Sequence, residues 1–220
     1  MKRALFRWLW RLWRPVAYDR QDGLRVSAVN GTRMIVLPGV FDGVALRTGV
    51  MLAAALDDTR CPPGARVLDL GTGSGIGAIA AARRGAHVVA TDINPEAARC
   101  AQINALAHHL EARIETRVGD LFAPVPDERF DVILFNPPYY RGQPRDLADH
   151  AWRSPDAFDR FLRELPAHLA PKGRALVVLS TDGDIADALG SATHLQVQSV
   201  EQRELHNERL TVFELRARGQ

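Results

Sequence analysis

From residue 64 onward, the chain alternates short apolar runs with segments in which apolar residues recur at helical spacing. Runs such as ARVLDL, AHVVAT and FDVILF have the length and composition of buried strands. We expect strands over 65–70, 86–91, 113–118, 130–135, 174–180, 195–204 and 209–216. We expect helices over 76–84, 95–110, 156–169 and 184–192. This alternation predicts an α/β fold.

The order of these segments predicts how the strands pair. Strands joined through helices lie parallel, because the crossover returns the chain to the same end of the sheet. Gly85, Pro95 and Pro171 stand where segment boundaries are expected. A short polar loop around Glu208 joins the last two strands and predicts an antiparallel hairpin. We therefore expect a doubly wound, mostly parallel seven-stranded sheet with helices on both faces and an antiparallel C-terminal hairpin.

Length and composition limit the class of protein. With 220 residues and 46% hydrophobic content, the chain suits one compact α/β domain. Cys61 and Cys100 fit no metal-binding spacing and are too few for a disulfide framework, which indicates a reducing, cytoplasmic compartment. The seven histidines are scattered along the chain, so we expect no metal site.

The charge is unevenly distributed along the chain. Residues 1–14 carry five basic side chains and no acidic one, whereas the rest of the chain has 23 basic against 26 acidic side chains. A protein that grips many phosphates needs a positive face, and no such face is evident after residue 14. We therefore expect no extensive contact with nucleic acid.

The basic leader MKRALFRWLWRLWRP has the pattern of an amphipathic helix. At helical spacing, Arg3, Arg7, Arg11 and Arg14 share one narrow face, apolar residues cover the remainder, and Pro15 ends the helix. The arginines interrupt every apolar run, so the pattern predicts neither a transmembrane helix nor a signal peptide. Two alternatives stay open: a helix packed on the domain, or one that docks on a membrane surface or a partner.

The stretch VLDLGTGSGIG is the first chemical motif. A predicted strand ends at Leu70, and Gly71, Gly73 and Gly75 follow at alternate positions before a predicted helix. Backbone without side chains can approach a ligand closely there, which predicts a cofactor loop. A dinucleotide fingerprint would have glycine where Ile76 stands. Tight strand-to-helix turns also use glycine for purely structural reasons.

Two aspartates follow the next two predicted strands. Asp92 is placed to accept both hydroxyls of a ribose, beside the glycine loop. Asn94 and Pro95 suit the cap and first position of a helix. Asp120 is predicted to end the third strand, where it can accept a hydrogen bond from an exocyclic adenine amine, although a lone surface aspartate is commonly structural.

The fourth motif is the tetrad Asn136, Pro137, Pro138 and Tyr139, directly after the strand DVILF. With it, the chain resembles the class I S-adenosylmethionine-dependent methyltransferases, which have a Rossmann-like fold, over about residues 35–216. The tetrad is similar to that of the subgroup that methylates planar nitrogens. Within that subgroup, the resemblance is to the release-factor glutamine N5-methyltransferases, in their compact type without an N-terminal helical domain.

The resemblance implies S-adenosylmethionine as cofactor and assigns residues to it. Asp69, Gly71 and Gly73 would line its methionine end, Asp92 would hold the ribose and Asp120 the adenine. The segment GVFDGVALRTG implies a further contact near Phe41 and Thr48. The complete set of expected cofactor-binding residues is Thr48, Asp69, Gly71, Thr72, Gly73, Gly75, Asp92, Ile93, Asp120, Leu121 and Asn136.

The tetrad has a chemical rationale in amide methylation. An amide nitrogen is a poor nucleophile because its lone pair is delocalised, so an enzyme must orient it. The Asn136 side-chain oxygen and the Pro137 carbonyl can each accept one N–H of a substrate NH₂, while Pro138 fixes the turn. Tyr139 would pack against the planar group, near the sulfonium. We thus expect Asn136, Pro137 and Tyr139 to be catalytic, and all four to bind substrate. A Pro-Pro turn that merely ends a strand is the structural alternative.

Substrate and partners are less constrained. We favour a protein glutamine, as in a release factor, because relatives that methylate bases usually add a recognition domain. The compact type works with a small activator subunit and carries an Ala-Trp step like Ala151 and Trp152. The alternatives are methylation of N6-adenine, another nucleic acid or a small molecule, a nicotinamide oxidoreductase, and a non-catalytic binding module.

These patterns divide the chain into three parts. We expect a leader helix over 1–15, a segment over 16–63 at the cofactor site and a core over 64–220.

Overall fold

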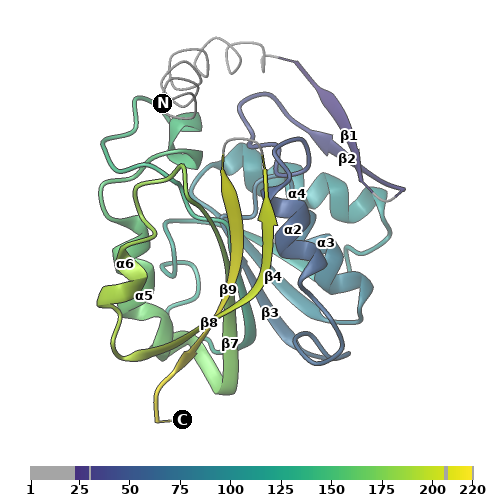
Figure 1. The fold of residues 1–220 in the computed structure, drawn as a ribbon. Helices are drawn as coiled ribbons and strands as arrows, with labels where there is room; N and C mark the ends of the chain where they lie inside the picture. Colours follow the sequence, from purple (N-terminus) through teal and green to yellow (C-terminus); the bar gives the residue numbers. More distant parts are fainter. Residues whose placement is uncertain (1–22, 30, 206–207, 220) are drawn as a thin grey trace.

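The computed structural model describes residues 23–29, 31–205 and 208–219, and the predicted leader helix over 1–15 lies outside them. A seven-stranded sheet, in the order β5-β4-β3-β6-β7-β9-β8, forms its centre (Figure 1). The first five strands in this order are parallel, and β9 pairs antiparallel with both β7 and β8. The predicted fold class is confirmed. The strands are β3 (Arg66–Leu70), β4 (His87–Asp92), β5 (Ile114–Val118), β6 (Phe130–Phe135), β7 (Leu169–Ser180), β8 (Leu195–Glu204) and β9 (Arg209–Ala217).

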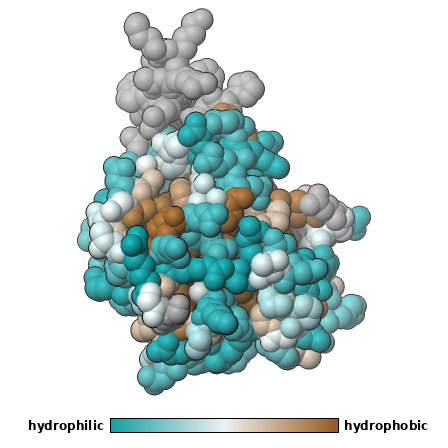
Figure 2. Space-filling model, turned by 60° about the horizontal axis from the view of Figure 1, so that its bottom comes forward, coloured by the Kyte–Doolittle hydropathy of each residue, from teal (hydrophilic) through white to brown (hydrophobic). Residues whose placement is uncertain are grey.

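Helices cover both faces of this sheet. The helices α2 (Thr48–Ala54), α3 (Ile76–Arg83) and α4 (Pro95–Ala107) lie on one side, and α5 (Ala157–His168) and α6 (Ala188–Ser191) on the other (Figure 1). Side chains alternate along each strand, so Val132 and Leu134 of β6 join one core while Ile133 and Phe135 join the other. Hydrophilic residues cover most of the face seen in Figure 2, and apolar ones form separate patches among them.

An N-terminal hairpin precedes the main sheet and was not predicted. Its strands β1 (Arg25–Val29) and β2 (Thr32–Val36) pair antiparallel. Asn104 of α4 holds β2 through both ends of its amide, because its Oδ1 accepts from the Ile35 N–H at 2.8 Å and its Nδ2 donates to the Ile35 carbonyl at 2.7 Å. These bonds attach the hairpin to α4, a helix that covers the main sheet.

Two predicted boundaries are wrong. Strand β7 begins at Leu169, directly after α5, and runs through Pro171, where we expected a break. An irregularity in the pairing with β6, between Phe130 and Val132, accommodates this segment. The helix predicted over 184–192 is reduced to α6, because the Asp184 N–H donates to the Tyr139 carbonyl at 2.8 Å and ties this stretch to the tetrad instead.

The carboxyl ends of four adjacent parallel strands, β5, β4, β3 and β6, meet at one edge of the sheet. The glycine loop, Asp92, Asp120 and the tetrad follow these four strands, so the topology brings all four motifs to that edge, as predicted. Asp120 lies two residues beyond the end of β5 rather than at its end. None of the helices in the described part of the chain is long and apolar enough to span a membrane.

Candidate active site

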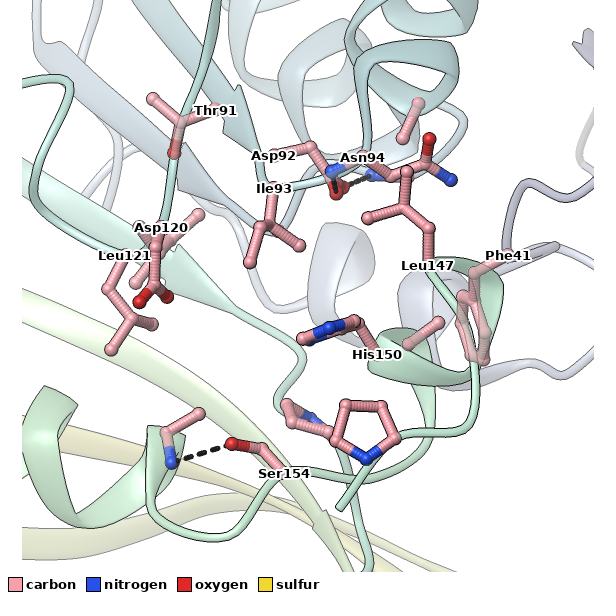
Figure 3. A pocket seen from close by; sticks show the side chains of 18 of the residues that line it. Phe41, Thr91, Asp92, Ile93, Asn94, Asp120, Leu121, Leu147, His150 and Ser154 are labelled. Atoms are coloured by element: carbon pink, nitrogen blue, oxygen red, sulfur yellow. Dashed lines mark hydrogen bonds between the residues drawn. The ribbon is translucent and has the colours of Figure 1, made fainter.

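A cavity of about 460 Å³ opens at the carboxyl ends of these four strands (Figure 3). One wall is made by the glycine loop and by the residues that follow β4, β5 and β6. The opposite wall comes from the segment over 143–157, which includes the 3₁₀ helix η1 (Ala148–Ala151), and from Gly39 and Phe41. Of the predicted cofactor residues, Gly71, Gly73, Asp92, Ile93, Asp120, Leu121 and Asn136 line this cavity.

The glycine loop depends on backbone conformations that favour glycine. Gly71, Gly73 and Gly75 all have positive φ, at 66°, 54° and 87°. A Cβ on Gly73 would come within 3.3 Å of the Phe41 carbonyl at the cavity wall. A Cβ on Gly75 would lie 3.0 Å from the Cα of Ala101, so Gly75 allows α3 to approach α4 instead of lining the cavity.

Asp69 of β3 holds the glycine loop through hydrogen bonds. Its Oδ2 accepts hydrogen bonds from the Thr72 hydroxyl at 2.6 Å and from the Ala78 N–H at 2.9 Å. Burial raises the pKa of Asp69 from its ordinary value of 3.8 to about 7. Asp69 and Thr72 line a smaller adjoining cavity rather than the large one. Both therefore support the loop, and their contact with the cofactor's methionine end stays a prediction.

Asp92 faces the large cavity with a fixed orientation (Figure 3). The Gly73 N–H donates to its Oδ2 at 2.9 Å, and the Asn94 N–H donates to its Oδ1 at 2.9 Å. Burial also raises the pKa of this carboxyl. Each oxygen keeps a further lone pair, so Asp92 can accept two more donors from a ligand.

Asn94 caps α4, which confirms its predicted structural role. Its side chain accepts from the Glu96 N–H at 3.0 Å, and Pro95 occupies the first helical position. Its Nδ2 also donates to the Gly39 carbonyl at 3.2 Å. This bond ties the segment before β3 to the cavity.

Asp120 stands at the other end of the cavity, where it pairs with Arg160 of α5. No sequence motif indicated this pair, because the two residues lie 40 positions apart. We expected the Asp120 carboxylate to bind only the adenine amino group, but it also forms an ion pair with Arg160.

Only some residues of the tetrad line the cavity. Asn136 and Pro138 line it, whereas Pro137 and Tyr139 are not among the described residues that do. The Asn136 Nδ2 donates to the Thr48 hydroxyl oxygen at 3.1 Å, and the Tyr139 hydroxyl donates to the Asn136 Oδ1. Burial raises the pKa of Tyr139. Tyr139 and Thr48 therefore fix the amide plane of Asn136. Packing of Tyr139 against the acceptor stays a prediction.

The segment over 143–157 supplies cavity residues that no sequence motif indicated, among them Leu147 and His150. His150 points into the cavity from η1, and Leu147 lies beside Phe41 (Figure 3). Trp152 packs edge-to-face on Phe41, with ring centroids 5.1 Å apart. The length of this connection between β6 and α5, with a short helix of its own, was the available signal for a functional loop.

Comparison with known proteins identifies the family. The model of the methyltransferase small domain matches residues 31–206 of this chain. The chain belongs to this family. As a member of the methyltransferase small domain family, it shares its sheet and C-terminal hairpin with solved class I methyltransferases.

Proteins similar to this chain carry names that refer to different methyl acceptors. A release factor glutamine methyltransferase of Cereibacter sphaeroides is 43% identical over 130 residues, which are 52% of this chain and 46% of that protein. A Methanocaldococcus jannaschii protein, provisionally named a protein N5-glutamine methyltransferase, is 31% identical over 71% of this chain and 80% of its own length. The chain spans about half the length of the release factor enzymes that it matches.

Among solved structures, a T. thermophilus 16S rRNA methyltransferase in complex with AdoMet and guanosine superposes with a TM-score of 0.67. It is 25% identical, and the superposition covers 89% of this chain and 50% of that one. Proteins similar to this chain are thus named both for a glutamine amide and for a guanine base.

Proposed function

We propose that this protein transfers a methyl group from S-adenosylmethionine to a planar nitrogen, the side-chain amide of a glutamine in a protein such as a release factor. The observation that carries the proposal is the fixed amide of Asn136 on the wall of the large cavity, between Thr48 and Tyr139. The name of the similar Cereibacter sphaeroides protein, a release factor glutamine methyltransferase, supports the same acceptor.

The cavity suits this cofactor in size and in chemistry. Its volume of about 460 Å³ lies within the range of roughly 300–1,000 Å³ that is usual for ligand pockets. Asp92 offers fixed acceptors for two ribose hydroxyls, and Gly71 and Gly73 bring bare backbone to the cavity wall. When bound, S-adenosylmethionine supplies a methyl group on a positively charged sulfur.

The residues of the tetrad would orient the acceptor nitrogen. The Asn136 Oδ1 receives one hydrogen bond from Tyr139 and keeps a second lone pair for an acceptor N–H. The Pro137 carbonyl would accept the other N–H. Two acceptors on one NH₂ hold its lone pair in a single direction, which is the orientation that methyl transfer requires. The proton released from the methylated nitrogen can pass to water.

A nicotinamide oxidoreductase would share the glycine loop and Asp92 but would have no use for Asn136. The two functions are separated by ligand binding. We expect the protein to bind S-adenosylhomocysteine, and not NAD, in a titration calorimeter. A non-catalytic binding module would bind S-adenosylhomocysteine as well, but would transfer no methyl label.

A guanine amino group is the second candidate acceptor. The T. thermophilus structure that supports it contains guanosine and covers 89% of this chain. An exocyclic base amine presents the same pair of N–H groups to Asn136 and Pro137 as an amide does. The acidic balance after residue 14 favours the protein acceptor, because a large RNA footprint needs basic side chains.

The deciding experiment offers both acceptors together. Tritiated S-adenosylmethionine is incubated with the protein, a release factor and 16S rRNA, and the labelled species are identified by mass spectrometry. We expect label on a glutamine of the release factor. Label on guanine would select the second candidate, and no transfer to either, with or without lysate to supply an activator subunit, would contradict the proposed acceptors.

The leader over 1–15 lies outside the described residues, so its role rests on the sequence. We propose that it attaches the protein to a membrane surface or to a partner, away from the chemistry. A chain starting at Val16 should then keep its melting temperature within a few degrees and lose sedimentation with anionic vesicles, or lose a bound partner. A large drop in melting temperature would show that the tryptophans pack in the core.

A further inference from the structure

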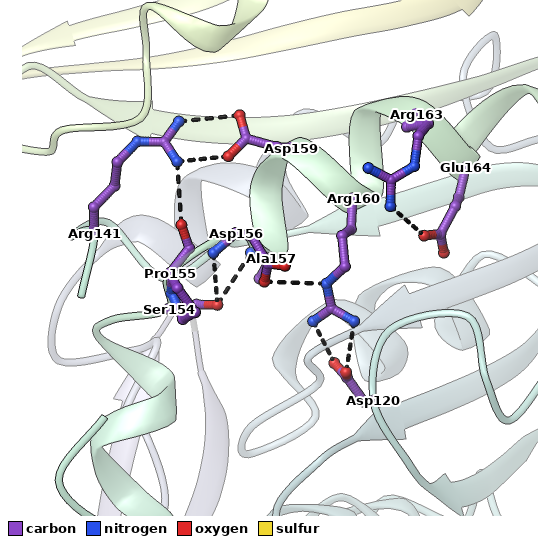
Figure 4. A network of polar contacts seen from close by, with 10 residues as sticks. All are labelled: Asp120, Arg141, Ser154, Pro155, Asp156, Ala157, Asp159, Arg160, Arg163 and Glu164. Atoms are coloured by element: carbon purple, nitrogen blue, oxygen red, sulfur yellow. Dashed lines mark hydrogen bonds and ion pairs between the residues drawn. The ribbon is translucent and has the colours of Figure 1, made fainter. Parts of the chain in front are cut away.

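The guanidinium of Arg160 grips both oxygens of Asp120 at the edge of the cavity (Figure 4). Its two terminal nitrogens donate to Oδ2 at 2.7 Å and to Oδ1 at 3.2 Å. Two roughly parallel N–H···O bonds define a plane as well as a position. Asp120 follows a strand end on a loop, and its side chain is 44% exposed, so without Arg160 it would be free to rotate into solvent.

Arg160 is itself held from its own helix. Its Nε donates to the Oδ1 of Asp156, the residue directly before α5, at 3.2 Å. The start of α5 is fixed by the Ser154 hydroxyl oxygen, which accepts from the Ala157 N–H at 3.0 Å. Because three of its nitrogens are engaged, the guanidinium has little freedom to leave Asp120.

Arg141 also holds the start of α5 in place (Figure 4). Its guanidinium donates to both oxygens of Asp159, one of them at 3.0 Å, and to the Pro155 carbonyl at 3.3 Å. The connection from the tetrad to α5 is thereby tied to the helix that carries Arg160. The whole arrangement directs the Arg160 guanidinium of α5 at the Asp120 carboxylate that follows β5.

The pairing leaves Asp120 able to accept further hydrogen bonds. Each carboxylate oxygen has two lone-pair directions, and Arg160 occupies one on each oxygen. The remaining directions lie in the plane that the guanidinium fixes, and Asp120 lines the cavity beside Leu121 and Gly119. A fixed carboxylate of this kind recognises a ligand N–H donor and gains nothing from a ligand without one.

We propose that Arg160 is a positioning residue for cofactor recognition: it holds the Asp120 carboxylate in the orientation that accepts the adenine amino group. The inference rests on the proposed function, because it assumes an adenine-bearing cofactor in this cavity. Arg160 acts through Asp120, so its removal should weaken recognition of the amino group specifically and leave the rest of the cofactor's contacts intact.

The test compares two ligands that differ only in that amino group. Dissociation constants of S-adenosylhomocysteine and of its analogue with purine in place of adenine are measured by calorimetry for the unaltered protein and for Arg160→Met. Methionine keeps much of the apolar stem and removes every donor. We expect the unaltered protein to prefer the adenine ligand by about tenfold or more, since hydrogen bonds to charged groups are worth that much. Arg160→Met should lose most of this preference, with binding of the purine analogue changed less than about twofold.

Three further variants make the result specific. Arg163→Met removes another arginine of α5, one that pairs with Glu164 away from the cavity, and should leave both dissociation constants unchanged. Arg160→Lys restores the charge without the fork and should recover the preference only partly. Asp120→Ala should lose the preference, and adding Arg160→Met to it should have little further effect.

Several results would overturn the proposal. An equal loss for both ligands would mean that Arg160 only supports the cavity wall. Tighter binding of S-adenosylhomocysteine by Arg160→Met would mean that Arg160 competes for Asp120 instead of positioning it. Unchanged binding of both would remove Arg160 from recognition while leaving the proposed function standing. Failure of the unaltered protein to bind S-adenosylhomocysteine would contradict the proposed function and this inference together.

Discussion

Two regions of the cavity hold their aspartate side chains by different kinds of interaction. At the inner wall, formed by the ends of β3 and β4, Asp92 faces the cavity with both oxygens bonded to backbone N–H groups. The buried Asp69 supports the glycine loop of this wall and lines the smaller adjoining cavity. At the outer wall, formed by Asp120 and Arg160, a half-exposed carboxylate is held by a side chain from another element. The three aspartates belong to neighbouring strands of the sheet: Asp69 is the penultimate residue of β3, Asp92 is the last of β4, and Asp120 lies two residues beyond β5.

The comparison shows which interactions fix the carboxylates at each wall. Backbone N–H groups are placed by the fold itself, so the inner wall keeps its geometry as long as the domain is folded, and burial raises the pKa of both its aspartates. The outer wall depends on an ion pair that water and salt can screen. We therefore expect changes at the inner wall to affect folding and affinity strongly, and changes at the outer wall to affect recognition more mildly.

The largest effect should be the pH dependence that Asp69 imposes on the inner wall. Its pKa is about 7 in the folded protein and 3.8 ordinarily, so between these values the folded state holds a proton that the unfolded state has lost. The free energy of unfolding should therefore fall as pH rises from about 4 to about 7, by up to about 4 kcal/mol from this group. Urea unfolding of the unaltered protein and of Asp69→Asn, across this range, measures it.

The variant isolates Asp69 because asparagine has no proton to exchange and can still accept from Thr72 and Ala78. Asp69→Asn should have a distinctly flatter profile, with a remainder from groups such as Asp92. Identical pH profiles for the two proteins would show that Asp69 does not hold a shifted proton.

Crowding in the glycine loop should have the next largest effect. Gly75→Ala places a Cβ against Ala101 at positive φ and should cost about 3 kcal/mol of unfolding free energy, from backbone strain and overpacking together. Gly64→Ala is the matched control, since Gly64 has a similar φ of 82° with nothing within 4 Å of the new Cβ, and should cost about 1 kcal/mol. Equal costs in urea unfolding would refute the close approach of α3 to α4.

The two walls can be compared directly through cofactor affinity. Asp92→Ala should weaken S-adenosylhomocysteine binding by about 2–3 kcal/mol, because two ribose hydroxyls lose an acceptor of fixed orientation. Asp120→Ala should cost less, about 1.5 kcal/mol, because it loses one hydrogen bond between the adenine amino group and a half-exposed carboxylate. Calorimetry decides the order of the two losses, and a larger loss for Asp120→Ala would reverse our ranking of the walls.

Salt should produce the smallest effect, and only at the outer wall. Raising the NaCl concentration from about 0.05 M to about 0.5 M shortens the screening length to a few ångströms and should weaken S-adenosylhomocysteine binding by about twofold. Arg160→Met should show less of this dependence, since its ion pair is already absent. A salt dependence that is the same in both proteins would place the screened charges elsewhere.

The sheet and its motifs were predictable because each strand of the core is a compact apolar run. FDVILF and ARVLDL gave boundaries that agree within one residue with β6 and β3. The N-terminal hairpin was missed even though Asn-Gly, between RVSAV and TRMIV, is a strong hairpin signal. The predicted helix over 184–192 failed because a long-range bond to the Tyr139 carbonyl overrides local propensity.

The candidate site was predictable in its residue types and less so in their partners. Glycines, aspartates and the tetrad stand at strand ends, and topology alone brings strand ends together. The partners of these residues come from distant segments, as with Thr48 for Asn136 and Arg160 for Asp120. In the sequence, Arg160 has the spacing of an ordinary helical ion pair with Asp156, which it also forms.

The central claim is that Asn136 orients an acceptor nitrogen for methyl transfer. Its most direct test is the maximal rate of transfer by Asn136→Ala to the acceptor identified by labelling, together with the dissociation constant of S-adenosylhomocysteine. We predict a rate lower by about 100-fold or more, with the dissociation constant within about twofold of the unaltered protein. A rate that survives within about threefold would mean that the tetrad is only a turn, and would contradict the account.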